Sequence, residues 1–223
     1  MSVSIRARRR ALVLVSVVAL ATGPLSLAAP APAQVAAARA TFTKGPKATL
    51  TGPAQVGRVL TAHTGRPVPA PDRFRFQWLS DGKPVPGATG RTYTVRAADM
   101  YALMAVRVTA LKAGYRPARD LSPSTPNVAV GGFSTPPTAT ISGVAVVGQT
   151  LTAGHGTALP KPDEYEYQWL RGDQLIAHAT HQTYVVSPDD LGQQLAVRVT
   201  ARRDGFYPYD DLSDPTAPVV AAG

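Results

Sequence analysis

The chain of 223 residues has no cysteine and only four histidines. Without cysteine it forms no disulfide, no thiolate metal site and no iron–sulfur cluster. Aromatic residues make up only 7% of the chain. No apolar run reaches the roughly 20 residues that a membrane-spanning helix needs. Stability must therefore come from burial and backbone pairing alone. Proline (21) and glycine (19) are abundant, which favours short strands joined by turns.

The first 33 residues have the pattern of a signal peptide. Arginines at positions 6 and 8–10 precede an apolar stretch from Ala11 to Thr22, and Ala31-Pro32-Ala33 has the small-x-small pattern of a cleavage site. We predict cleavage after Ala33 and a secreted or extracellular protein, either diffusible or associated with the cell wall. An uncleaved anchor is the alternative. The export route, general secretory or twin-arginine, stays open.

The rest of the chain is an internal repeat with a constant shift of 91 residues, as between Trp78 and Trp169. About 35 of roughly 82 aligned positions are identical without a gap. A unit of this size buries its own core. We predict an Ala-rich leader at 34–46, repeat 1 at 47–130, a Gly/Pro linker at 131–137 and repeat 2 at 138–221.

Within each repeat the pattern is that of β-strands. Polar and apolar residues alternate strictly from Arg73 to Trp78 and from Glu164 to Trp169, so one face takes aromatics into a core and the other takes charges to water. Asp81-Gly82 marks a hairpin turn. The fold class predicted is all-β, with two tandem β-sandwich domains around a core that includes Trp78, Trp169, Tyr93 and Tyr184.

Several motifs carry a resemblance to a known family. Repeat 2 contains "ISG", "VGQTLTA", "YQWL", "TY" and "AVRVTA" in this order, and repeat 1 has "LTG", "VGRVLTA", "FQWL", "TY" and "AVRVTA" at the same places. In these motifs the chain resembles the bacterial immunoglobulin-like repeats of exported actinobacterial proteins, which occur as arrays and as appendages of secreted hydrolases. The resemblance implies an immunoglobulin-like sandwich with Trp78 and Trp169 on the third strand. It also implies that Ala62 with Ala105, and Ala153 with Ala196, occupy the positions of the antibody disulfide.

Catalytic and metal-binding patterns are weak. His178-x-x-His181 lacks a third ligand, and its counterparts in repeat 1 are glycines. The acidic residues Asp189, Asp190, Asp210, Asp211 and Asp214 fit solvated loops better than a calcium site. Arg171-Gly172-Asp173 spells an adhesion motif but also fits a turn. We predict no enzyme, no cofactor and no metal; a small hydrolase or metalloprotein is the alternative that these patterns do not support.

Charge distinguishes the two repeats. Residues 47–129 contain twelve basic and four acidic side chains, a net charge of +8, whereas residues 138–220 contain five and ten, a net charge of −5. Arg73 and Arg75 align with Glu164 and Glu166. We hypothesise that the basic face of repeat 1 meets an acidic surface: repeat 2 of the same chain, repeat 2 of a neighbour, or an anionic wall polymer. The alternative is neutral variation of solvated residues, and nucleic acid is not expected as a partner.

One loop of repeat 2, Gly205–Asp211, carries Tyr207 and Tyr209 beyond the aromatic residue that both repeats share. Exposed aromatic side chains of this kind can stack on a sugar ring. We therefore expect a non-catalytic secreted protein that acts as an interaction or structural module at the cell envelope. The alternatives are a spacer or accessory module for a secreted hydrolase, and a carbohydrate-binding module that uses this loop.

Overall fold

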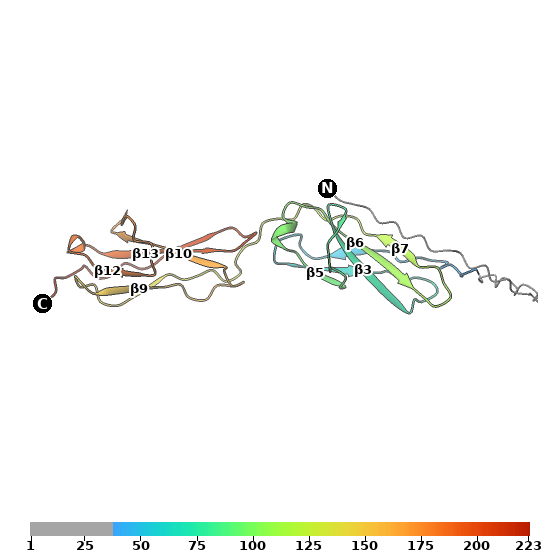
Figure 1. Ribbon diagram of the computed structural model, residues 1–223, viewed down its shortest axis with the longest axis horizontal. Coiled ribbons are helices and arrows are strands. Elements are labelled where there is room, and N and C mark those ends of the chain that lie inside the picture. The colour runs from blue at the N-terminus through green and yellow to red at the C-terminus, as the bar shows by residue number, and fades with distance from the viewer. Residues whose placement is uncertain (1–37) are drawn as a thin grey trace, which may run out of the picture. The chain divides into compact units, whose positions relative to one another are not determined.

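The computed structural model describes residues 38–223; the predicted signal peptide lies outside them. Each repeat consists of seven strands and one short 3-10 helix in the same order (Figure 1). Repeat 1 contains β1 (Thr49–Thr51), β2 (Val59–His63), β3 (Arg73–Ser80), β4 (Lys83–Pro84), β5 (Thr92–Thr94), η1 (Ala97–Asp99), β6 (Met104–Leu111) and β7 (Ala118–Leu121). Repeat 2 contains β8 (Thr140–Ser142), β9 (Thr150–Gly154), β10 (Glu164–Arg171), β11 (Gln174–Leu175), β12 (Thr183–Val185), η2 (Pro188–Asp190), β13 (Leu195–Arg202) and β14 (Tyr209–Leu212).

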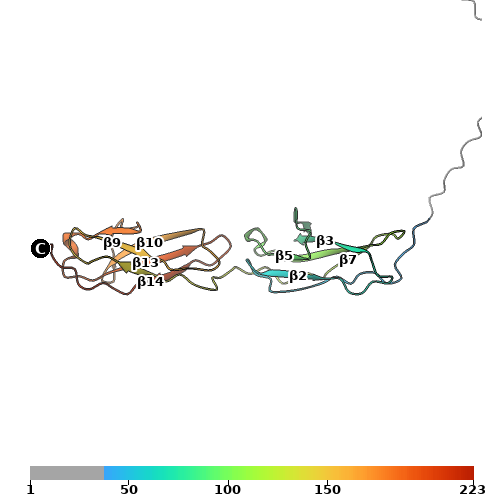
Figure 2. The same cartoon turned by 90° about the horizontal axis from the view of Figure 1, so that it is seen from below.

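The strands of each repeat form two antiparallel sheets that pack face to face (Figures 1 and 2). In repeat 1 the smaller sheet has the order β1-β2-β5 and the larger one β4-β3-β6-β7. Repeat 2 has the same arrangement, β12-β9-β8 and β11-β10-β13-β14. No strand pairing among the described residues joins one repeat to the other. The predicted all-β fold of two tandem immunoglobulin-like sandwiches is thus confirmed. The fourth strand of each repeat, β4 or β11, belongs to the larger sheet and pairs with β3 or β10.

The core of each sandwich is centred on a tryptophan. Trp78 and Trp169 are fully buried, and their rings stack on Tyr93 and Tyr184 with centroids 5.5 Å apart in both repeats. The indole N–H of Trp78 donates to the carbonyl of Gly90 at 2.9 Å. A buried indole needs such a partner, because an unpaired N–H would lose the hydrogen bond it makes to water.

The expected disulfide-like positions need a correction on one strand. Ala62 belongs to the core, but Ala105 does not, although it is buried. Side chains alternate between the two faces of a strand, and it is Met104 and Val106 that point between the sheets. The alignment with the antibody disulfide is therefore shifted by one residue on β6, and Ala196 on β13 is likewise outside the core cluster.

The segments that precede each sandwich are hydrogen-bonded to it in the same way. Ala40 pairs with Tyr115 in repeat 1, and Gly131 pairs with Phe206 in repeat 2. Further along, Lys44 pairs with Val68 and Thr135 with Leu159. The part of the leader that is described, and the segment 131–137 predicted as a linker, thus both bond to the repeat that follows them.

Candidate functional site

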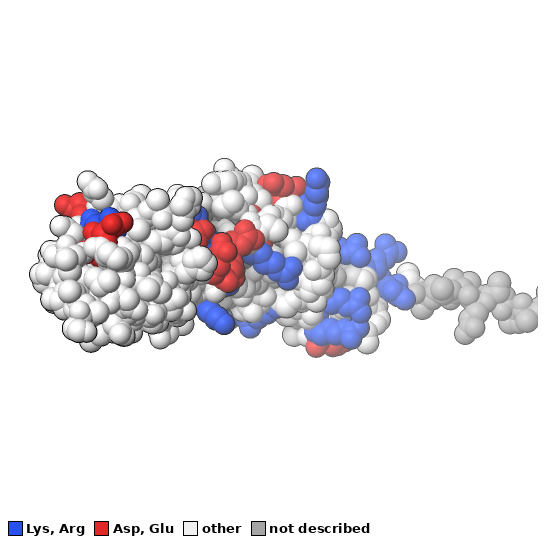
Figure 3. Space-filling view, turned by 60° about the vertical axis from the view of Figure 1, so that its left-hand side comes forward, with Lys and Arg blue, Asp and Glu red and all other residues white. Residues whose placement is uncertain are grey.

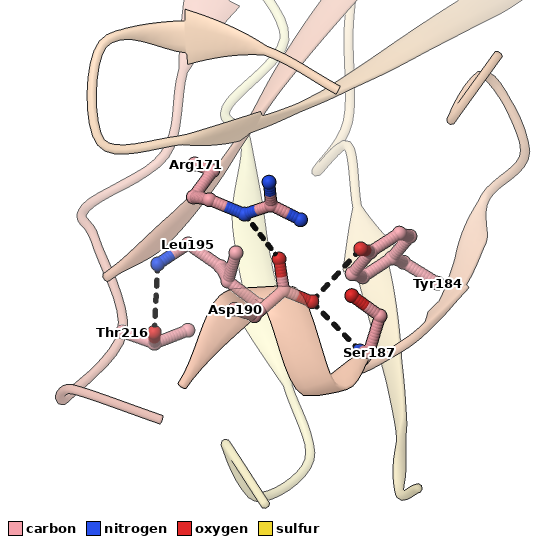
Figure 4. Close-up of polar contacts among 6 residues, drawn as sticks. All are labelled: Arg171, Tyr184, Ser187, Asp190, Leu195 and Thr216. Atoms are coloured by element: carbon pink, nitrogen blue, oxygen red, sulfur yellow. Dashed lines mark hydrogen bonds and ion pairs between the residues drawn. The ribbon is translucent and has the colours of Figure 1, made fainter. Parts of the chain in front are cut away.

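A buried carboxylate lies at the centre of a polar network in repeat 2 (Figure 4). Asp190 ends the helix η2 and is 0% exposed. Its Oδ2 accepts hydrogen bonds from the Tyr184 hydroxyl at 2.8 Å and from the Ser187 backbone N–H at 2.7 Å. Its Oδ1 accepts one from Arg171 Nε at 2.6 Å. A buried charge is tolerated only when it is paired and hydrogen-bonded in this way.

These contacts determine the ionisation state of the Asp190 carboxyl group. Burial by itself would raise the pKa of Asp190, but the hydrogen bonds from Ser187, Arg171 and Tyr184 favour the charged form more strongly, and the pKa lies below its ordinary value. Burial also raises the pKa of the Tyr184 hydroxyl, and the adjacent carboxylate raises it further. The tyrosine therefore stays a neutral donor and the aspartate a charged acceptor at neutral pH.

Repeat 1 contains the same network without the arginine. Asp99 accepts from the Tyr93 hydroxyl at 2.6 Å and from the Arg96 backbone N–H at 3.0 Å. Ser80 occupies the position of Arg171. Because both repeats hold the carboxylate, we assign it to the framework, where it fixes the helical turn before β6 or β13. The sequence contains the signal for it, a tyrosine six residues before an aspartate in both repeats, but a pattern analysis does not single it out.

The larger sheet of repeat 1 presents a strongly basic outer surface. Arg73 and Arg75 on β3, Arg107 on β6 and Arg119 on β7 are all exposed and alternate with residues that point inward. We call these four arginines the basic face. Within residues 38–223 none of the four has an ion-pair partner within 4.0 Å. Figure 3 shows basic side chains gathered on repeat 1.

A groove lies at one end of the basic face. It has a volume of about 540 Å³ and is lined by Arg73, Arg75, Arg39, Lys112, Asp72 and Tyr115, among others. The single carboxylate, Asp72, contacts Lys112 at 3.4 Å and accepts from the Ala113 backbone N–H at 2.8 Å. The three arginines of the lining are therefore available to bind an anionic group.

The same surface of repeat 2 is acidic. Glu164 and Glu166 on β10 and Asp210 on β14 are exposed, and we call them the acidic face. Arg202 lies among them: its Nε contacts Glu166 Oε1 at 2.6 Å, and its pKa is raised by Glu166 first and then by Glu164 and Asp210. Arg198 lies on the same side of the sheet. The acidic face is therefore partly neutralised, unlike the basic face.

The two tyrosines considered for sugar binding do not form a common platform. Tyr207 is 67% exposed, whereas Tyr209 is 41% exposed and begins strand β14, so it lies in the sheet and not in the loop. No ring pair among the described residues includes either of them. The aromatic residue that both repeats share, Phe206, packs against Phe133 with ring centroids 5.7 Å apart.

The histidines are spread over separate places. His63 Nε2 contacts Thr51 Oγ1 at 2.9 Å, and His155 stacks on Tyr165 with centroids 3.8 Å apart. His178 sits in a turn with a φ of 61°, a conformation that its counterpart Gly87 also adopts. The backbone carbonyl of His181 accepts from the Trp169 indole. In residues 38–223 no group of three or more His, Asp or Glu side chains is placed to hold a metal ion.

The Arg171-Gly172-Asp173 motif is used by the fold. Arg171 is committed to Asp190, and Gly172 takes a φ of 55° in the hairpin turn, where repeat 1 has Asp81 with a φ of 47°. Of the other acidic residues, Asp211 accepts from the Ala139 backbone N–H at 2.7 Å and so holds strand β8 against β14. No helix of the described chain is long and apolar enough to span a membrane.

No protein-family model matches the chain, and no curated protein matches it. Solved structures of tandem β-sandwich domains are similar to it. A two-domain fibronectin type III segment of chicken tenascin is 16% identical over 75% of this chain and 98% of its own, with a TM-score of 0.35. The tandem immunoglobulin repeats of Dlar are 18% identical over 80% of this chain and 100% of their own, with a TM-score of 0.25. Immunoglobulin domains 1–5 of Sidekick-1 are 16% identical over 81% of this chain and 39% of their own, with a TM-score of 0.34. At identities and TM-scores this low the likeness carries no conclusion about function, and the fold assignment rests on the strand order given above.

Proposed function

We propose that the protein is an exported, non-catalytic interaction module of the cell envelope, and that it binds acidic surfaces through the basic face of repeat 1. The fold supports a structural or interaction role, since tandem sandwiches of this kind present sheet faces and loops to partners. The cellular location rests on the signal pattern of the first 33 residues.

The observation that carries the proposal is the charge of the basic face. Its four arginines are exposed on three neighbouring strands, and no acidic side chain of the described part of the chain pairs with them. Like charges held this close repel one another, which disfavours the folded state slightly unless a partner compensates. An arginine fork suits carboxylate and phosphate groups, because it donates two parallel hydrogen bonds to either.

Poly-L-glutamate is a suitable probe, because it offers carboxylates without a defined shape. The chain from Gln34 onward should bind the labelled polymer at low ionic strength, and the affinity should fall steeply as salt is added. We expect Arg73→Glu/Arg75→Glu to weaken binding at least tenfold, since two attractive charges become repulsive.

Arg58→Glu/Arg66→Glu is the matched control: it makes the same change in net charge at exposed positions outside the basic face. It should retain most of the affinity. Equal losses in the two double variants would mean that net charge alone, and not this face, attracts the polymer.

A further inference from the structure

The outer side of the larger sheet in repeat 1 places three arginines around one threonine. Arg75 on β3 lies opposite Thr109 on β6, and Thr109 lies opposite Arg119 on β7. Residues paired in this way project to the same side of an antiparallel sheet, with Cβ atoms about 5 Å apart. Arg107 lies two residues before Thr109 on β6, so it projects to the same side about 7 Å along the strand. We call these four residues the threonine cluster.

Among the described residues, no carboxylate of β3, β6 or β7 projects to this side of the sheet. The outward residues of these strands are arginine, glutamine, leucine, alanine and threonine. Asp120 on β7 projects to the other side, where it accepts a hydrogen bond from the Ala48 backbone N–H at 2.7 Å. The positive charge around Thr109 is therefore not compensated by the strands that carry it.

Repeat 2 shows what the threonine does when a carboxylate lies beside it. Thr200 occupies the position of Thr109, and Asp210 lies opposite it. The Thr200 hydroxyl donates to Asp210 Oδ1 at 2.7 Å. In repeat 1 the residue at the position of Asp210 is Arg119, which has no acceptor atom. The hydroxyl of Thr109 is therefore available to donate to an oxyanion from outside the protein.

We infer that the threonine cluster binds the phosphate group of a phosphate monoester. This inference rests on the proposed function and names the group that the basic face recognises and the place where it binds. A phosphate monoester carries nearly two negative charges at neutral pH and has three terminal oxygens. Three guanidinium groups and one hydroxyl can donate to all three oxygens. A carboxylate or a phosphodiester has one charge and two such oxygens, so it leaves more of the positive charge uncompensated.

The spacing of the strands fits one such group. Neighbouring strands lie about 4.8 Å apart, so the Cα atoms of Arg75 and Arg119 are about 10 Å apart with Thr109 midway. The two arginine side chains can therefore approach one phosphate from opposite sides, each with a planar fork that donates two parallel hydrogen bonds. The hydroxyl of Thr109 lies between them on the sheet surface.

The rest of the ligand has room beside the threonine cluster. Leu111 follows Thr109 on the outer side of β6, about 7 Å further along, and lines the groove of about 540 Å³ described above. Arg75 belongs to both the cluster and the groove, and Tyr115 and Pro117 add to the apolar part of the lining. A phosphate held at Thr109 thus has a groove next to it that can take its organic substituent.

The test is a titration of the chain from Gln34 onward with methyl phosphate at pH 7.5 in 20 mM salt, followed by the backbone amide signals of β6 in NMR spectra. We expect saturable binding with a dissociation constant in the low millimolar range, since the site is exposed. Dimethyl phosphate and acetate, which carry a single charge, should bind about fivefold more weakly or less. Inorganic phosphate should bind no more tightly than methyl phosphate; a site that prefers the free ion about tenfold contradicts the assignment to an ester.

Thr109→Val tests the hydroxyl, because it keeps the shape and the charge of the site. It should weaken the binding of methyl phosphate about 3- to 10-fold, the effect of losing one hydrogen bond. Thr200→Val makes the same change at the equivalent place in repeat 2 and should leave binding unchanged. Arg119→Asp copies repeat 2 and should abolish binding, since the introduced carboxylate accepts from the hydroxyl and repels the phosphate.

The converse change in repeat 2 tests whether the arrangement is sufficient. Glu166→Arg/Asp210→Arg places three arginines around Thr200, because Arg198 already occupies the position of Arg107. This variant should bind two equivalents of methyl phosphate where the unmodified chain binds one, and the amide signals of β13 should then shift as well. A single equivalent in a folded variant counts against the inference.

An unmodified chain that does not bind methyl phosphate, or that binds it equally well after Thr109→Val, overturns the inference. If such a chain still binds poly-L-glutamate through Arg73 and Arg75, the proposed function stands and the basic face recognises carboxylates without this subsite. If polymer binding is absent as well, both fail.

Discussion

The buried network around Asp190 predicts that the stability of repeat 2 depends more strongly on its central carboxylate than the stability of repeat 1 does. In Asp190→Asn the amide keeps the shape and one oxygen. That oxygen can still accept from Tyr184 and Ser187, as Oδ2 does now. The amide nitrogen then faces Arg171 Nε, which is a donor against a donor. The variant thus loses the charge-assisted hydrogen bond and leaves the arginine to turn toward water.

The loss expected is about 1.5–3 kcal/mol in the free energy of unfolding of repeat 2, the range for hydrogen bonds to charged groups. For a domain of this size each kcal/mol lowers the melting temperature by about 4–8 °C, so the transition should fall by roughly 6–24 °C. Asp99→Asn is the matched change in repeat 1, where no arginine contacts the carboxylate, and it should cost less.

Differential scanning calorimetry of the full chain separates the repeats, because each variant should shift one transition and leave the other in place. Arg171→Ser copies repeat 1 at this position. It removes the same charge-assisted hydrogen bond from the buried carboxylate and should therefore cost a similar amount, about 1.5–3 kcal/mol. A melting profile for Asp190→Asn that matches the unmodified chain refutes this account of the network.

The same network predicts a dependence on pH. The pKa of Asp190 is lower in the folded chain than its ordinary value, so the ionised carboxylate stabilises the fold. This contribution is complete above the unfolded pKa of about 3.9 and is lost as the pH falls through the lower, folded pKa. The difference in unfolding free energy between the unmodified chain and Asp190→Asn should therefore be constant at neutral pH and shrink below about pH 4. Urea titrations at pH 7, 4 and 3 measure it, and a difference that grows toward pH 3 contradicts the assignment.

Two further predictions concern the backbone and the tyrosines. Gly143 has a φ of 111°, and a Cβ there would lie 2.8 Å from the backbone oxygen of Thr150, so Gly143→Ala should destabilise repeat 2 by about 1–3 kcal/mol in urea unfolding. Gly82→Ala, with a φ of 75° and nothing within 4 Å, should cost only about 1 kcal/mol; equal costs would refute the role of the close approach. Tyr207→Ser should change stability by less than about 0.5 kcal/mol, because the ring is 67% exposed. If Tyr207→Ser/Tyr209→Ser is retained on insoluble peptidoglycan as strongly as the unmodified chain, the loop makes no sugar contact.

The strands were predictable because two independent patterns agree. The alternation from Arg73 to Trp78 indicates a strand with one buried face, and the same alternation recurs from Glu164 to Trp169. The outward direction of the charged residues follows from the alternation alone. The position of Ala105 was not predictable in the same way. Strand β6 is apolar on both sides near its start, so a shift of one residue reverses its faces without changing the pattern.

The Asp190 network was missed for a different reason. Asp190 follows another aspartate, and two adjacent acidic residues are typical of a solvated loop. Its partners Arg171 and Tyr184 come from β10 and β12, which the fold brings together across two sheets. By residue type alone, all three side chains are expected at the surface. Only the recurrence of tyrosine and aspartate at the same spacing in repeat 1 indicates that the carboxylate belongs to the framework.

The reversed charges are informative because the fold does not depend on them. The tryptophan cores, the buried carboxylates and the strand pairing all involve residues that the two repeats share or replace conservatively, while the outer side chains of β3 and β10 contact mainly water. Exposed charges contribute only about 0–1 kcal/mol each to stability, so either sign is compatible with the sandwich. Neutral variation would scatter reversals over the whole surface. Here they occur only at Arg73, Arg75 and Arg119 and their counterparts, on one side of one sheet. A requirement of the fold does not explain that placement.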